Sequence, residues 1–201
     1  DYYRWHNTEH MPERVGVPGF LRGRRYLNTA RPLDYFTLYE TESVETIRSA
    51  PYLERLNDPT PWTRRLLPHF RDTMRVGCRV TASSGRGQGG ALVTARLYPK
   101  GARAELLRAG RPGLALVRQL GGVIGVHVLE PAPETTRIQT KEKELRGPQP
   151  GEAAPHDPWI LLVECNDAEL ADALVRGPLA DDAGQPGTVM GTYRLQFSLD
   201  R

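Results

Sequence analysis

The stretch WHNTEHMPER, residues 5 to 14, concentrates the residue types most able to do chemistry. His6 and His10 stand four residues apart with Glu9 beside the second, the spelling H-x-x-E-H. Residues four apart share a helix face, so both imidazoles could reach one zinc ion. Zinc proteases with this spelling need a further ligand and a larger chain to form the cleft. Pro12 should also end the helix at once. We therefore expect no metal site here.

A second interpretation makes the same run part of a small-molecule site. The ordinary pKa of histidine lies near neutrality, so His10 could act as a general base or acid, with Glu9 or Glu13 orienting its ring. We predict His10, Glu9 and Glu13 as catalytic residues, without a bound cofactor. The predicted substrate-binding residues are aromatic or cationic: His6, Trp5, Arg25, Tyr26, Tyr35 and Tyr39.

A third interpretation is structural. Trp5, Met11 and Phe20 would pack the helix on a sheet, and His10 would be a hydrogen-bonded post that fixes the following turn. Pro18 and Gly19 would set that turn, the glycine by tolerating positive φ. The structural and catalytic roles are not exclusive, and both remain open at this point.

Composition limits the classes of protein. The chain has 201 residues, 39% hydrophobic and 25% charged, which is typical of a soluble globular protein with one or two small domains. No run approaches the ~20 apolar residues that cross a bilayer. The net charge is only +3, and the basic run LRGRRY divides between two strand faces, so we expect no nucleic-acid partner. Cys78 and Cys165 form no CxxC pair and suggest free thiols in the cytoplasm.

Two segments echo one another. LYETESVE (38–45) and LVECNDAE (162–169) each end an apolar strand with Glu and then begin a helix. Around them, apolar patterns predict strands at 20–29, 35–40, 74–82, 91–99, 122–130, 158–165 and 191–199, and helical regions at 1–11, 43–70, 102–119 and 167–177.

This order predicts the domain organisation. Residues 91–201 follow β-α-β-β-α-β, the ferredoxin-like order, with a long insertion at about 131–157 in which TTRIQTKEKEL is expected to run extended. Residues 1–82 follow the same order without its first strand, which we expect upstream in the native chain; a three-stranded first sheet is the alternative. SSGRGQGG, residues 83–90, is the expected linker.

The run from Trp5 to Tyr26, W-x-x-x-E-H-x-P-E-R-x-x-x-P-G-F-x-x-x-R-R-Y, resembles tandem ferredoxin-like proteins of the dimeric α+β barrel superfamily. Relatives in that superfamily include EthD-like proteins, antibiotic-biosynthesis monooxygenases and muconolactone isomerases. The resemblance implies an α+β fold in which two ferredoxin-like repeats with antiparallel sheets close a barrel around a small-molecule cavity. It also implies a possible homodimer.

Together these observations predict a protein that binds or transforms a small aromatic or anionic molecule in the barrel cavity, without a tightly bound cofactor. If it is an enzyme, it should resemble a cofactor-independent monooxygenase or an isomerase. One alternative is a non-catalytic assembly protein whose barrel is filled by side chains. Another is a haem-binding or haem-degrading protein with His6 or His10 as the axial ligand.

Overall fold

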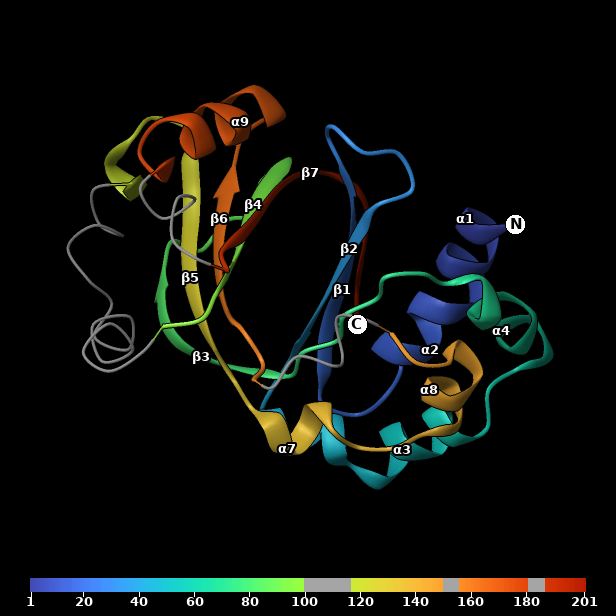
Figure 1. Cartoon of the computed structure of the whole chain (residues 1–201). Coiled ribbons are helices and arrows are strands. Elements are labelled where there is room, and N and C mark those ends of the chain that lie inside the picture. The colour runs from blue at the N-terminus through green and yellow to red at the C-terminus, as the bar shows by residue number, and fades with distance from the viewer. Residues whose placement is uncertain (100–116, 150–155, 181–186) are drawn as a thin grey trace.

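The computed structural model describes residues 1–99, 117–149, 156–180 and 187–201. Within them, a seven-stranded sheet curls so that its two halves face each other (Figure 1). The strands are β1 (Phe20–Asn28), β2 (Tyr35–Thr41), β3 (Cys78–Ser84), β4 (Ala91–Leu97), β5 (Val123–Pro131), β6 (Trp159–Cys165) and β7 (Val189–Asp200). Their spatial order is β2-β1-β7-β4-β6-β5-β3, and all neighbours are antiparallel. The predicted α+β fold with antiparallel strands is confirmed.

The first and second halves of the sequence share this one sheet because each contributes a strand that pairs with a strand of the other. β7, from the second half, pairs with β1 of the first, and β3, from the first half, pairs with β5 of the second. The edges of the sheet are β2 and β3. Gly89, in the predicted linker, lies so close to Cys165 that an added Cβ would meet the Cys165 carbonyl oxygen at 2.3 Å. The linker is therefore packed against the end of β6.

Helices cover the outer face of the sheet. Beside β1 and β2 lie α1 (Tyr2–Trp5), η1 (His6–His10), α2 (Met11–Val15), α3 (Ala50–Asn57), α4 (Pro61–Leu66) and α8 (Lys141–Arg146), and α9 (Ala168–Arg176) lies at the other half (Figure 1). Shorter helical turns are η2 (Val44–Arg48), η3 (Leu67–His69) and α7 (Pro133–Thr136). The predicted helix at 102–119 falls largely outside the described residues. No helix in the described ranges has the length and apolar character to cross a bilayer.

The first helix does not end at Pro12, as the sequence suggested. It runs from Tyr2 to Val15 because His6–His10 form a wide π turn, in which the Met11 amide donates to the His6 carbonyl five residues earlier. Pro12 then falls in the first turn of α2, where its missing N–H is tolerated. The predicted turn follows, with Gly19 at φ +86° and packed against Thr46.

The insertion is also more helical than predicted. Lys141–Arg146 form α8 rather than an extended edge, because the Thr140 side chain caps the first turn by accepting from the Lys143 amide. The following Lys, Glu, Leu and Arg are good helix formers. α8 carries Glu142 to the buried Arg14 of α2, with which it forms an ion pair.

Side chains alternate between the two faces of the sheet. The outer face buries one apolar cluster on each half, including Phe20 with Tyr52 and Val163 with Leu174. The inner face, between the halves, buries a third cluster of Tyr26, Leu92, Ile160, Leu162 and Tyr193. On β1, successive residues therefore face opposite sides, and the inner face is the one that any molecule held inside the curl would contact.

Candidate functional site

A group of charged and polar side chains lies on the otherwise apolar inner face. We call it the inner cluster: Arg24, Glu40, Ser83, His127 and Glu164. The Arg24 guanidinium donates to Glu164 Oε1 at 2.9 Å and to Glu40 Oε1 at 2.7 Å. The side chains of Arg24 and Glu164 are only 5% and 3% exposed. The Glu164 carboxylate also accepts from the Gly89 amide at 2.8 Å, so the linker helps to satisfy it. Buried charges with this many partners hold a fixed geometry.

His127 extends the inner cluster toward the edge of the sheet. Its Nδ1 lies 2.8 Å from Ser83 Oγ, and its Nε2 lies 3.9 Å from Glu164 Oε1. Burial lowers the pKa of His127; Glu164 opposes this shift and Arg24 adds to it. Gly125 leaves room for the ring, since a Cβ there would come within 2.9 Å of Nε2. Ser83, His127 and Glu164 thus form a row across β3, β5 and β6, with a neutral imidazole able to accept a proton.

Tyr26 stands beside this cluster with its ring 5.8 Å from the Arg24 guanidinium carbon. Its hydroxyl is buried close to the Arg24 guanidinium, which can only donate, and its O–H has no hydrogen-bond acceptor among the described residues. Burial raises the pKa of Tyr26, and the Arg24 charge only partly opposes this, so the hydroxyl stays protonated and can donate. Phe36 lies 6.2 Å from the Tyr26 ring and 5.6 Å from the Tyr193 ring, which makes a row of three aromatic side chains.

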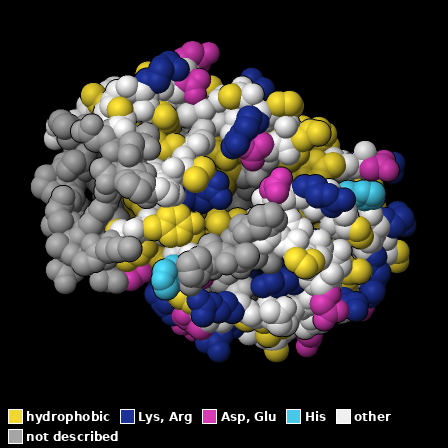
Figure 2. Space-filling view, viewed as in Figure 1, with side chains coloured by type: hydrophobic (Ala, Val, Ile, Leu, Met, Phe, Trp, Pro, Cys, Tyr) yellow, Lys and Arg dark blue, Asp and Glu magenta, His cyan; other side chains and the backbone are white. Residues whose placement is uncertain are grey.

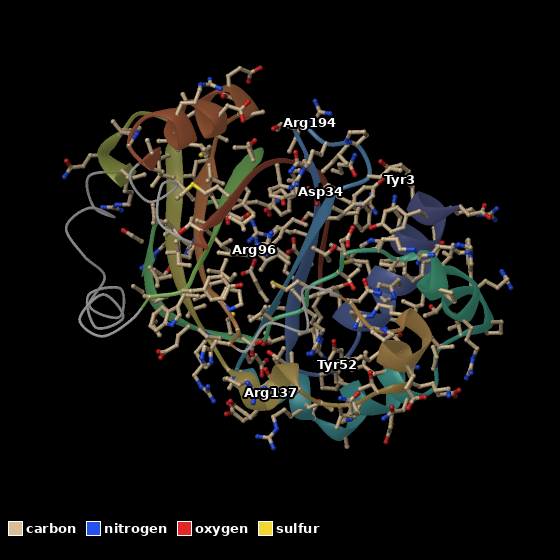
Figure 3. All side chains as sticks on the ribbon, in the orientation of Figure 1. Tyr3, Asp34, Tyr52, Arg96, Arg137 and Arg194 are labelled. Carbon is tan, nitrogen blue, oxygen red and sulfur yellow. The ribbon has the colours of Figure 1, made fainter. Side chains whose placement is uncertain are left out.

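The rest of the described inner face is mainly apolar, and it also carries Arg96. Hydrophobic and basic side chains lie side by side in the middle of the face seen in Figure 2. Figure 3 places Arg96 of β4 between the two halves of the sheet. Cys78 also lies on this face, where burial raises the pKa of its thiol to about 12, so it is not a nucleophile at neutral pH. The inner face thus combines buried apolar side chains with a polar cluster and a half-buried arginine.

The residues predicted from the N-terminal motif lie elsewhere, between the first helix and the outer face. Trp5 is fully buried, donates from Nε1 to Thr63 Oγ1 at 3.0 Å, and lies with its ring 4.3 Å from the ring of His10. Glu9 accepts from the hydroxyls of Thr60 and Thr63 and so joins the first helix to α4. Burial raises the pKa of Glu13, which is half-buried on α2. These contacts favour a structural role for Trp5 and Glu9, but not the predicted hydrogen-bonded post, because His10 Nδ1 is buried without a hydrogen-bond partner among the described residues. A catalytic role for His10, Glu9 or Glu13 stays a prediction.

His6 lies in the same layer. Its Nδ1 is 3.1 Å from an Arg25 Nη1 that also donates to Asn7 at 2.7 Å. The Arg25 guanidinium carbon lies 4.9 Å from the centre of the Tyr3 ring. A permanent positive charge against His6 disfavours a zinc or haem iron at this nitrogen. The described residues also contain no group of three or more His, Cys, Asp or Glu that could hold a metal ion.

The strand candidates divide between the two faces. Tyr26 is on the inner face, but Tyr35 and Tyr39 are on the helix-covered face: Tyr35 packs on Tyr2, and Tyr39 packs on Phe20. The alternation on β2 was predicted, yet Leu38 and Glu40 belong to the inner set rather than the two tyrosines. The sequence therefore separates the two sets correctly without saying which one faces the interior.

The inner cluster was largely missed. One signal pointed to it: Glu40 and Glu164 occupy matching places in the two echoing segments, and the structure brings both to Arg24. Arg24 was visible only as part of a basic run. Ser83, His127 and Arg96 carried no local signal, because nothing in their own neighbourhoods marks a residue that meets a distant strand.

The buried histidines give the protein a pH-dependent stability. Burial lowers the pKa of His6 to about 3, and the charges of Arg25 and Arg14 add to the shift. Burial also lowers the pKa of His10 well below its usual value, again with Arg14 adding. The unfolded chain binds these protons near pH 6.5, whereas the folded chain does not. Stability therefore falls as the pH drops from about 6.5 toward 3.

Replacing His6 with asparagine, which keeps an acceptor for Arg25, should remove one of these protons. The slope of unfolding free energy against pH should then decrease by about 1.4 kcal/mol per pH unit between roughly pH 6 and pH 4. Urea unfolding at several pH values measures it. His69→Asn, at an exposed histidine, is the control and should keep the original slope. Equal slopes in the wild type and His6→Asn would contradict the prediction.

Comparison with known proteins supplies relatives in fold only. No protein-family model matches the chain, and no curated protein matches its sequence. An anthrone oxidase-like protein of known structure aligns with a TM-score of 0.61 and 12% identity, over 95% of this chain and 83% of that one. A protein from Lactobacillus acidophilus NCFM, provisionally described as a monooxygenase, gives a TM-score of 0.54 and 10% identity over 99% of this chain and 90% of that one.

A second protein with that provisional description, from Fusobacterium nucleatum subsp. nucleatum, aligns with a TM-score of 0.51 and 8% identity, over 94% of this chain and 84% of that one. At such identities the likeness establishes shared architecture and nothing finer. This chain therefore shares its fold with these three proteins.

Proposed function

We propose that this chain binds and transforms a small aromatic molecule on the inner face of its curled sheet, without a tightly bound cofactor. One observation carries the proposal: a polar cluster and a protonated Tyr26 hydroxyl without an acceptor among the described residues adjoin a row of aromatic side chains on a face that is mainly apolar. A buried donor without a partner costs free energy unless it binds something. A carbonyl or hydroxyl oxygen of a bound ligand would satisfy it.

The side chains of the inner cluster and Tyr26 determine the chemistry that we propose. Tyr26 would donate to an oxygen of the ligand and fix its position. His127, neutral because it is buried, would donate from Nδ1 to Ser83 and accept a proton at Nε2 from a ligand hydroxyl or an acidic C–H. The Glu164 carboxylate, 3.9 Å from Nε2, would stabilise the imidazolium that forms. Proton removal leaves an electron-rich anion. That is the activating step both for an isomerase and for an oxygenase that relies on the substrate's own reactivity.

The structural neighbours favour the oxygenase branch. They include an anthrone oxidase-like protein and two proteins provisionally described as monooxygenases. The inner face of this chain, with its row of Tyr26, Phe36 and Tyr193, is suited to stacking against a fused aromatic ring.

The proposal includes a duplicated ferredoxin-like unit. In the β1–β2 pair Arg24 is opposite Leu38 and Arg22 is opposite Glu40; in the β5–β6 pair His127 is opposite Leu162 and Gly125 is opposite Glu164. The strands that pair across the two halves of the sequence follow the same pattern: Ser198 of β7 is opposite Arg24, and Ser83 of β3 is opposite His127. In a duplicated unit the counterpart of β4 would lie between the two edges, β2 and β3.

Tyr26→Phe tests the proposal. It removes the unpartnered hydroxyl and keeps the ring, so it should weaken binding of the probe 2-naphthol by about fivefold to tenfold, the value of one hydrogen bond. Isothermal titration calorimetry measures the dissociation constant. Tyr3→Phe, at a half-exposed tyrosine outside the sheet, should bind as the wild type does. Failure of the wild type to bind 2-naphthol, or unchanged binding by Tyr26→Phe, would count against the inner face as the site and favour an interior filled by side chains.

A further inference from the structure

We propose that Arg96 binds the anionic group of the ligand, so that the preferred substrate is an aromatic compound with a hydroxyl at one end and a carboxylate, or a similar single negative charge, at the other. This inference rests on the proposed function and adds the charge and length of the ligand to it.

The position of Arg96 is set by the pairing of β4. Arg96 is opposite Ile160 of β6 and Val189 of β7. Ile160 belongs to the inner apolar cluster, and Figure 3 shows Arg96 between the two halves of the sheet. Its side chain is half-buried. The guanidinium is therefore partly removed from water in surroundings that are mainly apolar, which raises the cost of leaving its charge uncompensated.

The partners of Arg96 do not compensate that charge. Within the described residues its hydrogen-bond partner is the thioether of Met74, with the Met74 sulfur 3.6 Å from Nη1. A thioether is a weak acceptor, whereas a guanidinium has five N–H donors in a planar fork. A carboxylate is the group that matches this fork with two parallel, charge-assisted hydrogen bonds.

Three other buried arginines of the chain have partners that compensate or shield their charge. Arg24 is held by Glu40 and Glu164, and Arg14 pairs with Glu142. Arg25 lacks a carboxylate but has the Asn7 amide oxygen and the ring of Tyr3. Arg96 carries the same guanidinium, but within the described ranges it has no carboxylate, amide oxygen or aromatic ring as a partner. The difference suggests that its partner arrives with the ligand.

The distance from Arg96 to the inner cluster sets the length of the ligand. Leu92 of β4 is opposite Glu164, so Arg96 lies four residues further along the strand. At ~3.3 Å per residue these positions are about 13 Å apart along β4. Leu92 and Ile160 provide apolar surface in the interval. Allowing for the reach of the arginine, this spacing corresponds to about the length of a fused two- or three-ring aromatic body with an anion at one end and a hydroxyl at the other.

The test compares two probes of equal shape, 6-hydroxy-2-naphthoate and its neutral amide, by isothermal titration calorimetry. We expect the wild type to bind the carboxylate at least about tenfold more tightly than the amide, as befits a charge-assisted pair. Arg96→Met should lose this preference and keep its affinity for the amide. Arg96→Lys should retain part of the preference, and Arg194→Met, at an exposed arginine, should retain all of it. A thermal melt of each variant confirms folding.

Three outcomes overturn the inference. Equal binding of both probes by the wild type, with 2-naphthol still bound, removes the anion site and leaves the proposed function in place. An equal loss of preference in Arg96→Met and Arg194→Met assigns the effect to overall charge. Binding of none of the three probes overturns the proposed function and, with it, the inference.

Discussion

Replacing Glu164 with alanine should destabilise the protein by about 3–5 kcal/mol, because it leaves the buried Arg24 guanidinium with only the partly exposed Glu40 as a partner. The same change strips the Gly89 amide of its acceptor and so releases the linker from the end of β6. Urea unfolding followed by circular dichroism gives the free energy.

The matched control is Glu134→Ala. Glu134 pairs with Arg79 at 2.6 Å, a shorter separation than that between Arg24 and Glu164, but on the surface. Water and salt screen an exposed pair, so this variant should leave the free energy of unfolding almost unchanged. If both variants were equally mild, the inner cluster would be hydrated rather than buried, and its use as a preorganised site would have to be abandoned.

Replacing Trp5 with alanine should cost a similar amount, about 3–5 kcal/mol, through the cavity left by a fully buried indole. Trp5 is the residue that joins the first helix to α4, by its bond to Thr63, and that covers His10. Thermal and urea unfolding would both register the loss. Trp62→Ala, at a half-buried tryptophan of α4, is the comparison and should cost clearly less.

This second prediction also separates the interpretations of the N-terminal motif. A Trp5→Ala protein that keeps its stability but loses ligand binding would support the interpretation of the N-terminal motif as part of the functional site. A large loss of stability, with the remaining folded protein still binding 2-naphthol, would establish Trp5 and its neighbours as the structural support of the first helix.

The strands could be predicted from the sequence because each has its own local pattern of apolar residues. The predicted strands at 20–29, 35–40 and 158–165 correspond to β1, β2 and β6 with small shifts at the ends. The continuation of the first helix through Pro12 could not be predicted from the sequence. It depends on a π turn that places the proline in a tolerated position, and no simple residue spacing indicates such a turn. Local periodicity reports local structure and little else.

The site was harder to predict for a different reason. Alternation along a strand assigns residues to two faces, but the choice between the faces depends on which one the helices cover. Arg24 and Glu164 are 140 positions apart and meet only because both lie on the inner face of one curled sheet. Of the substrate-binding residues proposed on β1 and β2, Tyr26 alone has the inner cluster beside it. A repeat of the same strand–Glu pattern was the one clue that linked the two halves.

The matching registers of the β1–β2 and β5–β6 pairs, in which Arg24 is opposite Leu38 and His127 is opposite Leu162, would have an evolutionary consequence in a duplicated unit. In a barrel assembled from two identical chains, each substitution appears on both sides of the symmetry axis. A single polypeptide that carries both halves is free of that constraint. In a duplicated unit Arg24 and His127 would be counterparts, since they are opposite Leu38 and Leu162, so one side would carry a guanidinium and the other an imidazole. If the halves are duplicated, joining them in one chain would let the two walls differ: under the proposed function, one would hold charge and the other would accept a proton.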